Sequence, residues 1–390
     1  MAKLLPLDGV TVIELGHSVA APYATEILGD LGADVIKVEK TDGDDARSWA
    51  PPYWGAMAAT FLSFNRNKRS VVVNLKDAGE RERLKRLILE RADVVIQNLR
   101  PGAAAEYGLD AASLRALKPA LVYCTIGAFG RIGPLKDRPG YDPLMQAFGG
   151  LMSVTGEPDQ RPVRAGTSII DMAAGMWSVI GVLAALLQRR AGGPEGASAE
   201  GATIDTSLYE TVLAFMCYHA ANFQASGELP RRHGSGAAMI APYRGYATKD
   251  GFIVIGAGND RLFATLARVL GHPEWIDDAR FRTNPDRVAN QAVLYRWIEE
   301  IIAGRTTREW QATLDAAGVP NAPMQTIAEV LAHPQTEALG MLQPSPDGDI
   351  TLVGLPLSFD GVRPAFRRAP PALGADTAEI LGEAAIASAR

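Results

Sequence analysis

Cysteine is scarce in this chain of 390 residues, which contains only Cys124 and Cys217. Both lie in apolar runs, and their separation matches neither a zinc site nor a disulfide framework. The five histidines also show no metal-ligand spacing. We therefore expect reduced core cysteines, no bound metal ion and a cytoplasmic location, where thiols stay reduced.

A strong excess of one charge is also missing. The chain has 39 Lys and Arg residues against 44 Asp and Glu residues, a net charge of -5, and 47% of its residues are hydrophobic. Interspersed charges of both signs are typical of a soluble globular protein and do not favour a nucleic-acid partner. Residues 1–9 lack the apolar core of a secretory signal.

The long apolar run at 172–187 falls short of the roughly 20 residues of a typical membrane span. It follows an aspartate inside a pattern typical of soluble proteins. We therefore expect a helix buried on every face in the core, and no membrane partner.

Two common enzyme signatures are absent as well. The turn at 16–22 lacks the glycine spacing that lets a dinucleotide pyrophosphate approach the backbone, which disfavours an ordinary NAD enzyme. No Gly-x-Ser-x-Gly segment precedes a helix, which argues against the common serine hydrolase fold.

The N-terminal half alternates apolar, β-branched runs with segments of helical spacing. Strands are predicted at 10–15, 33–39, 70–75, 93–98 and 121–127, with helices between them at 22–31, 77–90 and 110–117. Such strands with helical crossovers predict an α/β fold with a Rossmann-like parallel sheet covered on both faces.

A change of character near residue 227 predicts a second, smaller α+β domain. We expect the large domain at 1–226, the small domain at 227–323 and a return to the large domain at 324–390. Residues 193–201 read as a Gly/Pro/Ala-rich, hairpin-like connection.

Asp171 is the last charge before the long apolar run. Backbone N–H groups and the helix dipole favour an anion there, so we expect its carboxylate to stay ionised even when partly buried. The small residues at 172–175 would leave room for a ligand. The alternative is that Asp171 is only a helix cap, shared with Thr167 or Ser168.

Other polar groups permit two interpretations each. A basic cluster near the predicted strand ends could bind a phosphorylated cofactor or form a solvated rim; its members are Lys37, Lys40, Arg66, Lys68, Arg69 and Lys76. His17 could act as a base or be structural, and Asp142 could be a simple helix cap.

Five segments in order resemble one known family, the class III CoA-transferases, which include formyl-CoA and carnitine CoA-transferases. They are 31–39 after the turn at 16–22, then 65–70, 98–102, 140–142 and the Asp171 segment. The resemblance runs from Leu7 to the tail at 369–374. Segments 43–45, 49–52, 248–251 and 256–259 are most similar to the branch that moves CoA between dicarboxylates such as succinate and glutarate.

The resemblance implies covalent catalysis by Asp171 through an aspartyl-acyl anhydride and an aspartyl-CoA thioester. It implies an interlocked, ring-like homodimer and a mobile substrate loop at Gly234, Ser235 and Gly236. The CoA contacts that it implies are Val19, Ala20, Lys40, Val73, Asn74, Leu75, Lys76, Asn98, Leu99, Arg100 and Tyr141.

The sequence departs from the family pattern at three places. Val19 replaces the glutamine of the formyl-CoA enzymes, which argues against a formyl-CoA/oxalate pair. Glu106 replaces a basic CoA contact, and residues 237–239 suggest a less polar acyl pocket. Two alternatives remain: a 2-methylacyl-CoA racemase, which needs a proton-transferring histidine where this chain has Tyr141, and a non-catalytic CoA-binding protein.

Overall fold

The computed structural model describes residues 5–191 and 200–382 and divides into two compact units. The larger unit takes its residues from 1–149, 165–217 and 334–390, and the smaller unit from 150–164 and 218–333. The connection predicted at 193–201 lies almost entirely outside the described residues. The boundaries expected from the sequence at 227 and 323 remain a prediction about folding domains.

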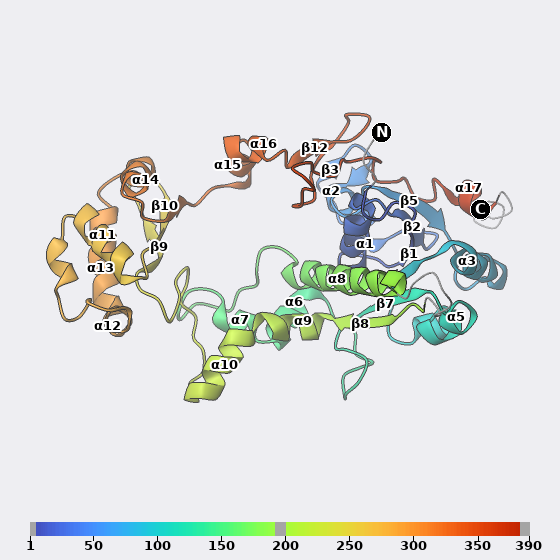
Figure 1. Cartoon of the computed structure of the whole chain (residues 1–390), viewed down its shortest axis with the longest axis horizontal. Helices are drawn as coiled ribbons and strands as arrows, with labels where there is room; N and C mark the ends of the chain where they lie inside the picture. The colour runs from blue at the N-terminus through green and yellow to red at the C-terminus, as the bar shows by residue number, and fades with distance from the viewer. Residues whose placement is uncertain (1–4, 192–199, 383–390) are drawn as a thin grey trace. The chain divides into compact units, whose positions relative to one another are not determined.

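A six-stranded sheet forms the centre of the larger unit (Figure 1). Its strands are rich in Val and Ile, which suit a sheet buried on both faces. All of its strand pairs are parallel. In spatial order the strands are β5 (Lys68–Val72), β2 (Asp34–Glu39), β1 (Thr11–Leu15), β6 (Val94–Gln97), β7 (Val122–Gly127) and β8 (Thr203–Ser207). The predicted parallel α/β fold is confirmed.

The strand order reverses beside β1. Val12 pairs with Val35 of β2 on one side and with Val94 of β6 on the other. Chain connections leave β1 and β6 in opposite directions at this point, which opens a crevice at the carboxyl ends of these strands. The topology thus selects one edge of the sheet for ligand binding.

Helices cover both faces of this sheet. Alternate strand residues such as Ile13 and Val95 pack on α3 (Ala78–Arg91) and α5 (Ala111–Leu117). On the opposite face lie α1 (Ala20–Asp30) and α8 (Ile169–Ala191).

The contact between α8 and α1 is close because Gly175 has no side chain. A Cβ atom at Gly175 would lie 2.8 Å from the carbonyl oxygen of Ala20. Ala173 and Ala174 are buried beside it. The small residues after Asp171 therefore serve helix packing, and the expectation that they leave space for a ligand was wrong.

Only one side of α8 is buried within the chain. The segment Ile169–Arg190 is long and apolar enough for a membrane span, yet half of its 18-residue apolar stretch is buried inside the protein. The exposed side carries Met176, Trp177, Ile180 and Leu187. The prediction of a core helix is confirmed for one face, and burial on every face was wrong.

The smaller unit contains an antiparallel three-stranded sheet packed by helices. Its strands β9 (Tyr243–Ala247), β10 (Phe252–Gly256) and β11 (Asn321–Pro323) lie in the order β11-β10-β9, and its helices include α11 (Asp260–Val269), α13 (Gln291–Ile302) and α14 (Thr307–Ala316). These elements share one apolar core. The predicted α+β character of this part is observed.

Two predicted elements differ from the structure. The apolar run at 208–225 predicts one continuous helix, which the structure breaks at Met216 into α9 (Leu208–Phe215) and α10 (Cys217–Ser226). The strand expected at 70–75 is β5, which begins at Lys68 and ends at Val72. Its outer edge bonds to the C-terminal segment, because the Val72 N–H donates to the hydroxyl of Thr377 in α17 (Thr377–Leu381).

Candidate functional site

A cavity of about 530 Å³ lies at the carboxyl edge of the sheet, in the larger unit. Its walls come from the turn after β1, the ends of β6 and β7, the loop before α6 (Asp142–Phe148) and the first turn of α8. Seven residues predicted for the site line it: Val19, Ala20, Asn98, Leu99, Arg100, Tyr141 and Asp171. The fold therefore brings together segments that are up to about 150 residues apart, as open α/β sheets do at such a crevice.

The other predicted contacts lie elsewhere among the described residues. Val73 is buried after β5, whereas Asn74 and Lys76 are exposed and Leu75 is partly buried in the turn before α3. Lys40 is exposed and forms an ion pair with Asp45 at 2.8 Å. The predicted loop Gly234, Ser235 and Gly236 belongs to the smaller unit, where the hydroxyl of Ser235 accepts the N–H of Gly245.

Asn98 fixes the backbone of the turn that follows β1. Its Oδ1 accepts the N–H of His17 at 3.0 Å, and its Nδ2 donates to the carbonyl of His17 at 2.9 Å. His17 Nδ1 lies 3.0 Å from Oγ of Ser18. Because Asn98 follows β6 and His17 follows β1, this pair of bonds joins the ends of the two strands between which the strand order reverses.

Ser18 adopts a left-handed backbone conformation, with φ of 68°, which is uncommon for a residue with a side chain. Its N–H donates to Oδ1 of Asp44 at 2.9 Å. The other oxygen of Asp44 lies 2.7 Å from Nζ of Lys37. The cavity wall is therefore held in its strained form by a buried carboxylate.

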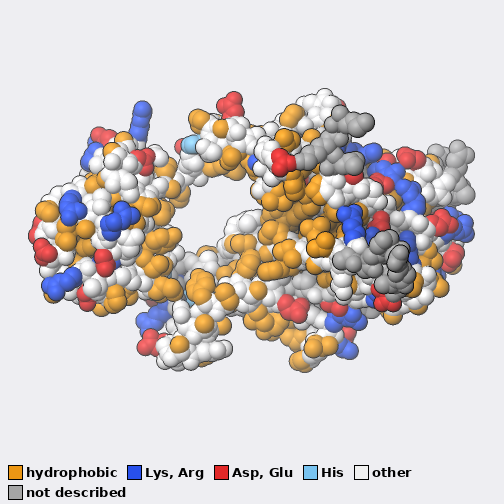
Figure 2. Space-filling view, viewed as in Figure 1, with side chains coloured by type: hydrophobic (Ala, Val, Ile, Leu, Met, Phe, Trp, Pro, Cys, Tyr) orange, Lys and Arg blue, Asp and Glu red, His pale blue; other side chains and the backbone are white. Residues whose placement is uncertain are grey.

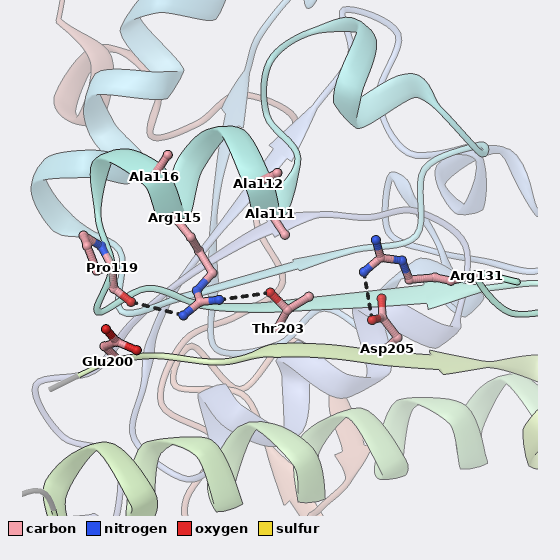
Figure 3. Close-up of a pocket in the computed structure, with 9 residues that line it drawn as sticks. All are labelled: Ala111, Ala112, Arg115, Ala116, Pro119, Arg131, Glu200, Thr203 and Asp205. Carbon is pink, nitrogen blue, oxygen red and sulfur yellow. Dashed lines mark hydrogen bonds and ion pairs between the residues drawn. The ribbon is translucent and has the colours of Figure 1, made fainter. Parts of the chain in front are cut away.

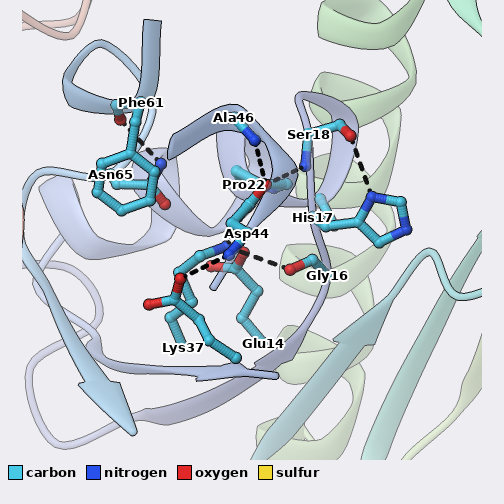
Figure 4. A network of polar contacts seen from close by, with 12 residues as sticks. Glu14, Gly16, His17, Ser18, Pro22, Lys37, Asp44, Ala46, Phe61 and Asn65 are labelled. Carbon is cyan, nitrogen blue, oxygen red and sulfur yellow. Dashed lines mark hydrogen bonds and ion pairs between the residues drawn. The ribbon is translucent and has the colours of Figure 1, made fainter. Parts of the chain in front are cut away.

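A buried network of ion pairs supports this wall from the sheet (Figure 4). Lys37 pairs with Glu14 at 2.6 Å, and Lys68 pairs with the second oxygen of Glu14 at 2.9 Å. These three side chains are fully buried. Burial opposes ionisation of Glu14, but the charges of Lys37 and Lys68 lower its pKa.

Four of the six residues of the basic cluster form ion pairs within the protein, so they neither bind a cofactor nor form a solvated rim. They are Lys37, Arg66, Lys68 and Arg69. Arg66 pairs with Glu26 and Asp30, and Arg69 with Asp34 and Glu379. The sequence could not reveal this, because the carboxylate partners are distributed over β1, β2, α1, α17 and the loop after β2 that contains Asp44.

Asp171 lies in the first turn of α8 and does not cap it. The cap is the carboxylate of Asp142, which is almost fully buried. Its Oδ2 accepts the N–H of Ile170 at 2.8 Å and that of Asp171 at 3.3 Å. Both cap hypotheses are corrected: Asp171 is not the cap, and Asp142 caps α8, which begins 27 residues after it in the chain.

The Asp171 carboxyl group is unusually basic. Burial and the nearby negative charge of Asp142 raise its pKa to about 7. The expectation that it stays ionised was therefore wrong near and below neutral pH, because desolvation and the second carboxylate outweigh the helix terminus. An aspartate carboxylate is ordinarily a weak base at pH 7. The raised pKa makes the Asp171 carboxylate more basic and therefore better suited to act as a nucleophile.

A second hollow of similar volume lies beside β8 and α5 (Figure 3). Its arginines are already engaged: Arg131 pairs with Asp205 at 3.0 Å, and Arg115 donates to the carbonyls of Gly201 and Pro119. Its described carboxylates are Glu200 and Asp205, of which Asp205 already pairs with Arg131. Among the described residues, no group of three or more His, Cys, Asp or Glu side chains could hold a metal ion.

Sequence reasoning missed several residues of the cavity lining, including Gln97, Arg131 and Lys136. A usable signal was present for Gln97, which ends β6, whereas Arg131 and Lys136 lie farther along the loop that follows β7. Gln97 is the last residue of β6, and its side-chain oxygen accepts the N–H of Leu99 at 2.8 Å.

Comparison with known proteins identifies the family. The model of CoA-transferase family III matches residues 7–377. The chain is 37% identical to the succinyl-CoA:glutarate CoA-transferase of Mus musculus, over 98% of this chain and 87% of the relative. It is equally 37% identical to the succinate–glutarate CoA-transferase of Agrobacterium fabrum, over 97% of this chain and 95% of the relative.

A solved structure agrees with this result. A CAIB/BAIF family protein from Brucella suis is 38% identical, covers 100% of both chains and superimposes with a TM-score of 0.86. The matches extend over both units and include every segment that lines the cavity. The chain therefore belongs to CoA-transferase family III and is an enzyme of the CoA-transferase class.

Proposed function

We propose that this enzyme transfers CoA from succinyl-CoA to a dicarboxylic acid acceptor such as glutarate, with Asp171 as the covalent carrier. The observation that supports this most directly is the Asp171 carboxyl group itself. It lines the cavity at the strand-order reversal, and its pKa is raised to about 7. Relatives from Chloroflexus aurantiacus and Haloarcula hispanica, named succinyl-CoA–D-citramalate and succinyl-CoA:mesaconate CoA-transferases, support succinyl-CoA as donor.

The reaction begins when an oxygen of the ionised Asp171 attacks the thioester carbonyl of succinyl-CoA. The carbon–sulfur bond breaks, and the CoA thiolate leaves a mixed aspartyl-succinyl anhydride. The thiolate then attacks the aspartyl carbonyl, which releases succinate and forms an aspartyl-CoA thioester. Covalent catalysis of this kind divides one difficult exchange into easier steps.

The acceptor carboxylate runs the same steps in reverse. It attacks the aspartyl thioester, and the CoA thiolate leaves a new anhydride with Asp171. Attack of the thiolate on the acceptor carbonyl gives the product thioester and regenerates the aspartate carboxylate. No external oxidant, reductant or base is consumed.

The larger unit offers a route for the pantetheine arm along the cavity walls. Val19 and Ala20 line it from the turn after β1 and the start of α1, and Asn98, Leu99 and Tyr141 line it from other segments. Partial burial of Asp171 limits the hydration of its carboxylate. A carboxylate with fewer bound waters is the better nucleophile.

A panel assay tests the proposed reaction. The purified enzyme is incubated with succinyl-CoA or acetyl-CoA and a series of mono- and dicarboxylic acids, and the thioester products are identified by mass. We expect glutarate with succinyl-CoA to give glutaryl-CoA and succinate in equal amounts. Release of free CoA without a new thioester, or exchange of the α-hydrogen of a 2-methylacyl-CoA with no movement of CoA, would contradict the proposal.

The proposed enzyme acts as a homodimer. Hydrophobic side chains gather over α8 and its neighbours in Figure 2, and the exposed face of α8 contributes Trp177, Ile180 and Leu187. Contiguous exposed apolar surface of this kind favours association. Light scattering after gel filtration should give twice the chain mass of 41.6 kDa, and the single-chain mass at micromolar concentration would oppose this part of the proposal.

A further inference from the structure

Asp142 and Gln146 link α6 to the segment that carries the nucleophile. Gln146 is fully buried, and its Nε2 donates to Oδ1 of Asp142 at 2.5 Å. Its Oε1 accepts the N–H of Ala165 at 2.8 Å. Since Oδ2 of Asp142 accepts N–H groups of α8, the two side chains fix both the approach to α8 and its first turn.

This arrangement separates two tasks that one aspartate could otherwise perform. A side-chain oxygen at a helix start normally accepts the free N–H groups of the first turn. Here Asp142 accepts them, so the Asp171 carboxylate does not need to cap the helix and can react with a substrate. Asp142 does not line the cavity, whereas its neighbour Tyr141 and Asp171 do.

We propose that Asp142 is the positioning residue of this active site: its buried carboxylate holds the first turn of α8 and, by its negative charge, makes the Asp171 carboxylate a stronger nucleophile. The inference rests on the proposed function, because it assigns a role in covalent transfer by Asp171. It differs from a purely structural cap in one respect. The charge of Asp142, as well as its hydrogen bonds, must matter to the reaction.

The Asp142→Asn variant separates these contributions. Its amide oxygen can still accept the N–H groups of Ile170 and Asp171, so only the bond to Gln146 is lost, because Oε1 of Gln146 stays with the N–H of Ala165. The fold should therefore persist, while the negative charge is lost. Asp142→Ala removes both the charge and the bonds, and misplacement of the nucleophile should lower kcat by about 10²-fold.

The decisive readout is the pH profile of transfer with saturating acceptor. The wild-type rate should rise with pH through about 7 as Asp171 loses its proton. In Asp142→Asn the acidic limb should move to lower pH and the plateau rate should fall, with KM for acyl-CoA nearly unchanged. The other titratable or charged groups that line the cavity are His17, Arg100, Asp110, Tyr123, Arg131, Lys136, Asp137 and Tyr141.

Two controls complete the experiment. Asp77→Asn removes the charge of another helix-capping aspartate, which accepts the N–H of Glu80 at 2.8 Å outside the cavity, and it should leave the pH profile unchanged. The Asp142→Asn shift should persist in a His17→Asn background. An unaltered acidic limb and plateau in Asp142→Asn, with active wild type, would overturn the positioning role alone. An inactive wild type would instead overturn the proposed function.

Discussion

Replacement of Asp171 by alanine should abolish CoA transfer while acyl-CoA still binds. Loss of a covalent nucleophile commonly costs on the order of 10⁴-fold or more in kcat, because the remaining site can only bind and orient the substrate. We expect glutaryl-CoA formation to fall below detection in the panel assay. Calorimetry should return an affinity for CoA close to that of the wild type.

The covalent step can be observed directly. Hydroxylamine cleaves an aspartyl-CoA thioester to a hydroxamate and free CoA, so peptide mass analysis after incubation with succinyl-CoA should place the label on Asp171. Asp171→Asn provides a control of the same shape and should carry no label. Retained transfer in Asp171→Ala, or a label on another residue, would refute the covalent role.

Asp171→Ala should be at least as stable as the wild type. Asp171 has a pKa in the folded protein above that of a free aspartate, so its ionisation opposes folding as pH rises from about 4 to about 7. Removal of this carboxylate should therefore leave the unfolding temperature equal or higher at pH 8. Loss of activity together with loss of structure would not be the predicted result.

Among the substitutions proposed for this protein, Lys37→Met should cause the largest loss of stability. The change would leave the carboxylates of Glu14 and Asp44 buried without their shared cation. Removal of one partner from a buried ion pair typically costs about 3–5 kcal/mol in the free energy of unfolding. Urea unfolding followed by circular dichroism measures this difference.

The pH dependence gives this prediction a sign. Lys37 helps to lower the pKa of Glu14 and of Asp44 against the effect of burial, so the stability from these pairs is present above the unfolded pKa values and is lost in acid. The deficit of Lys37→Met should thus be greatest near neutral pH and shrink in acid. Lys40→Met is the control: its pair with Asp45 is exposed, and the change should cost about 1 kcal/mol or less. Equal losses in both variants would contradict the argument.

The sequence predicted the fold class well because the parallel strands have a strong local signal. Val94–Gln97 and Val122–Gly127 lie within the predicted ranges. The end of β5 at Val72 could not be predicted from neighbours in sequence. It depends on hydrogen bonds from a segment about 300 residues away.

The candidate site was predicted in part, with Asp171 singled out by its place before the long apolar run and Asn98 and Tyr141 by the family resemblance. Asn98, Tyr141 and Asp171 follow strands or begin helices, and they do meet at one cavity. The raised pKa of Asp171 was not foreseeable, because its causes are burial and the charge of a residue on another helix. Pairing of Lys37 and Lys68 with Glu14 was equally hidden, since each residue alone reads as a surface charge.

The absence of a side chain at Gly175 limits which positions can change when related enzymes evolve to use other acceptor acids. The glycine sets the spacing between α8, which carries Asp171, and the start of α1, whose Ala20 lines the cavity. Any larger residue would push the first turns of α8, and with them Asp171, away from Ala20 for every substrate alike. We therefore expect relatives with other acceptor acids to keep the contact between Gly175 and Ala20 and to differ in the loops at the carboxyl edge of the sheet.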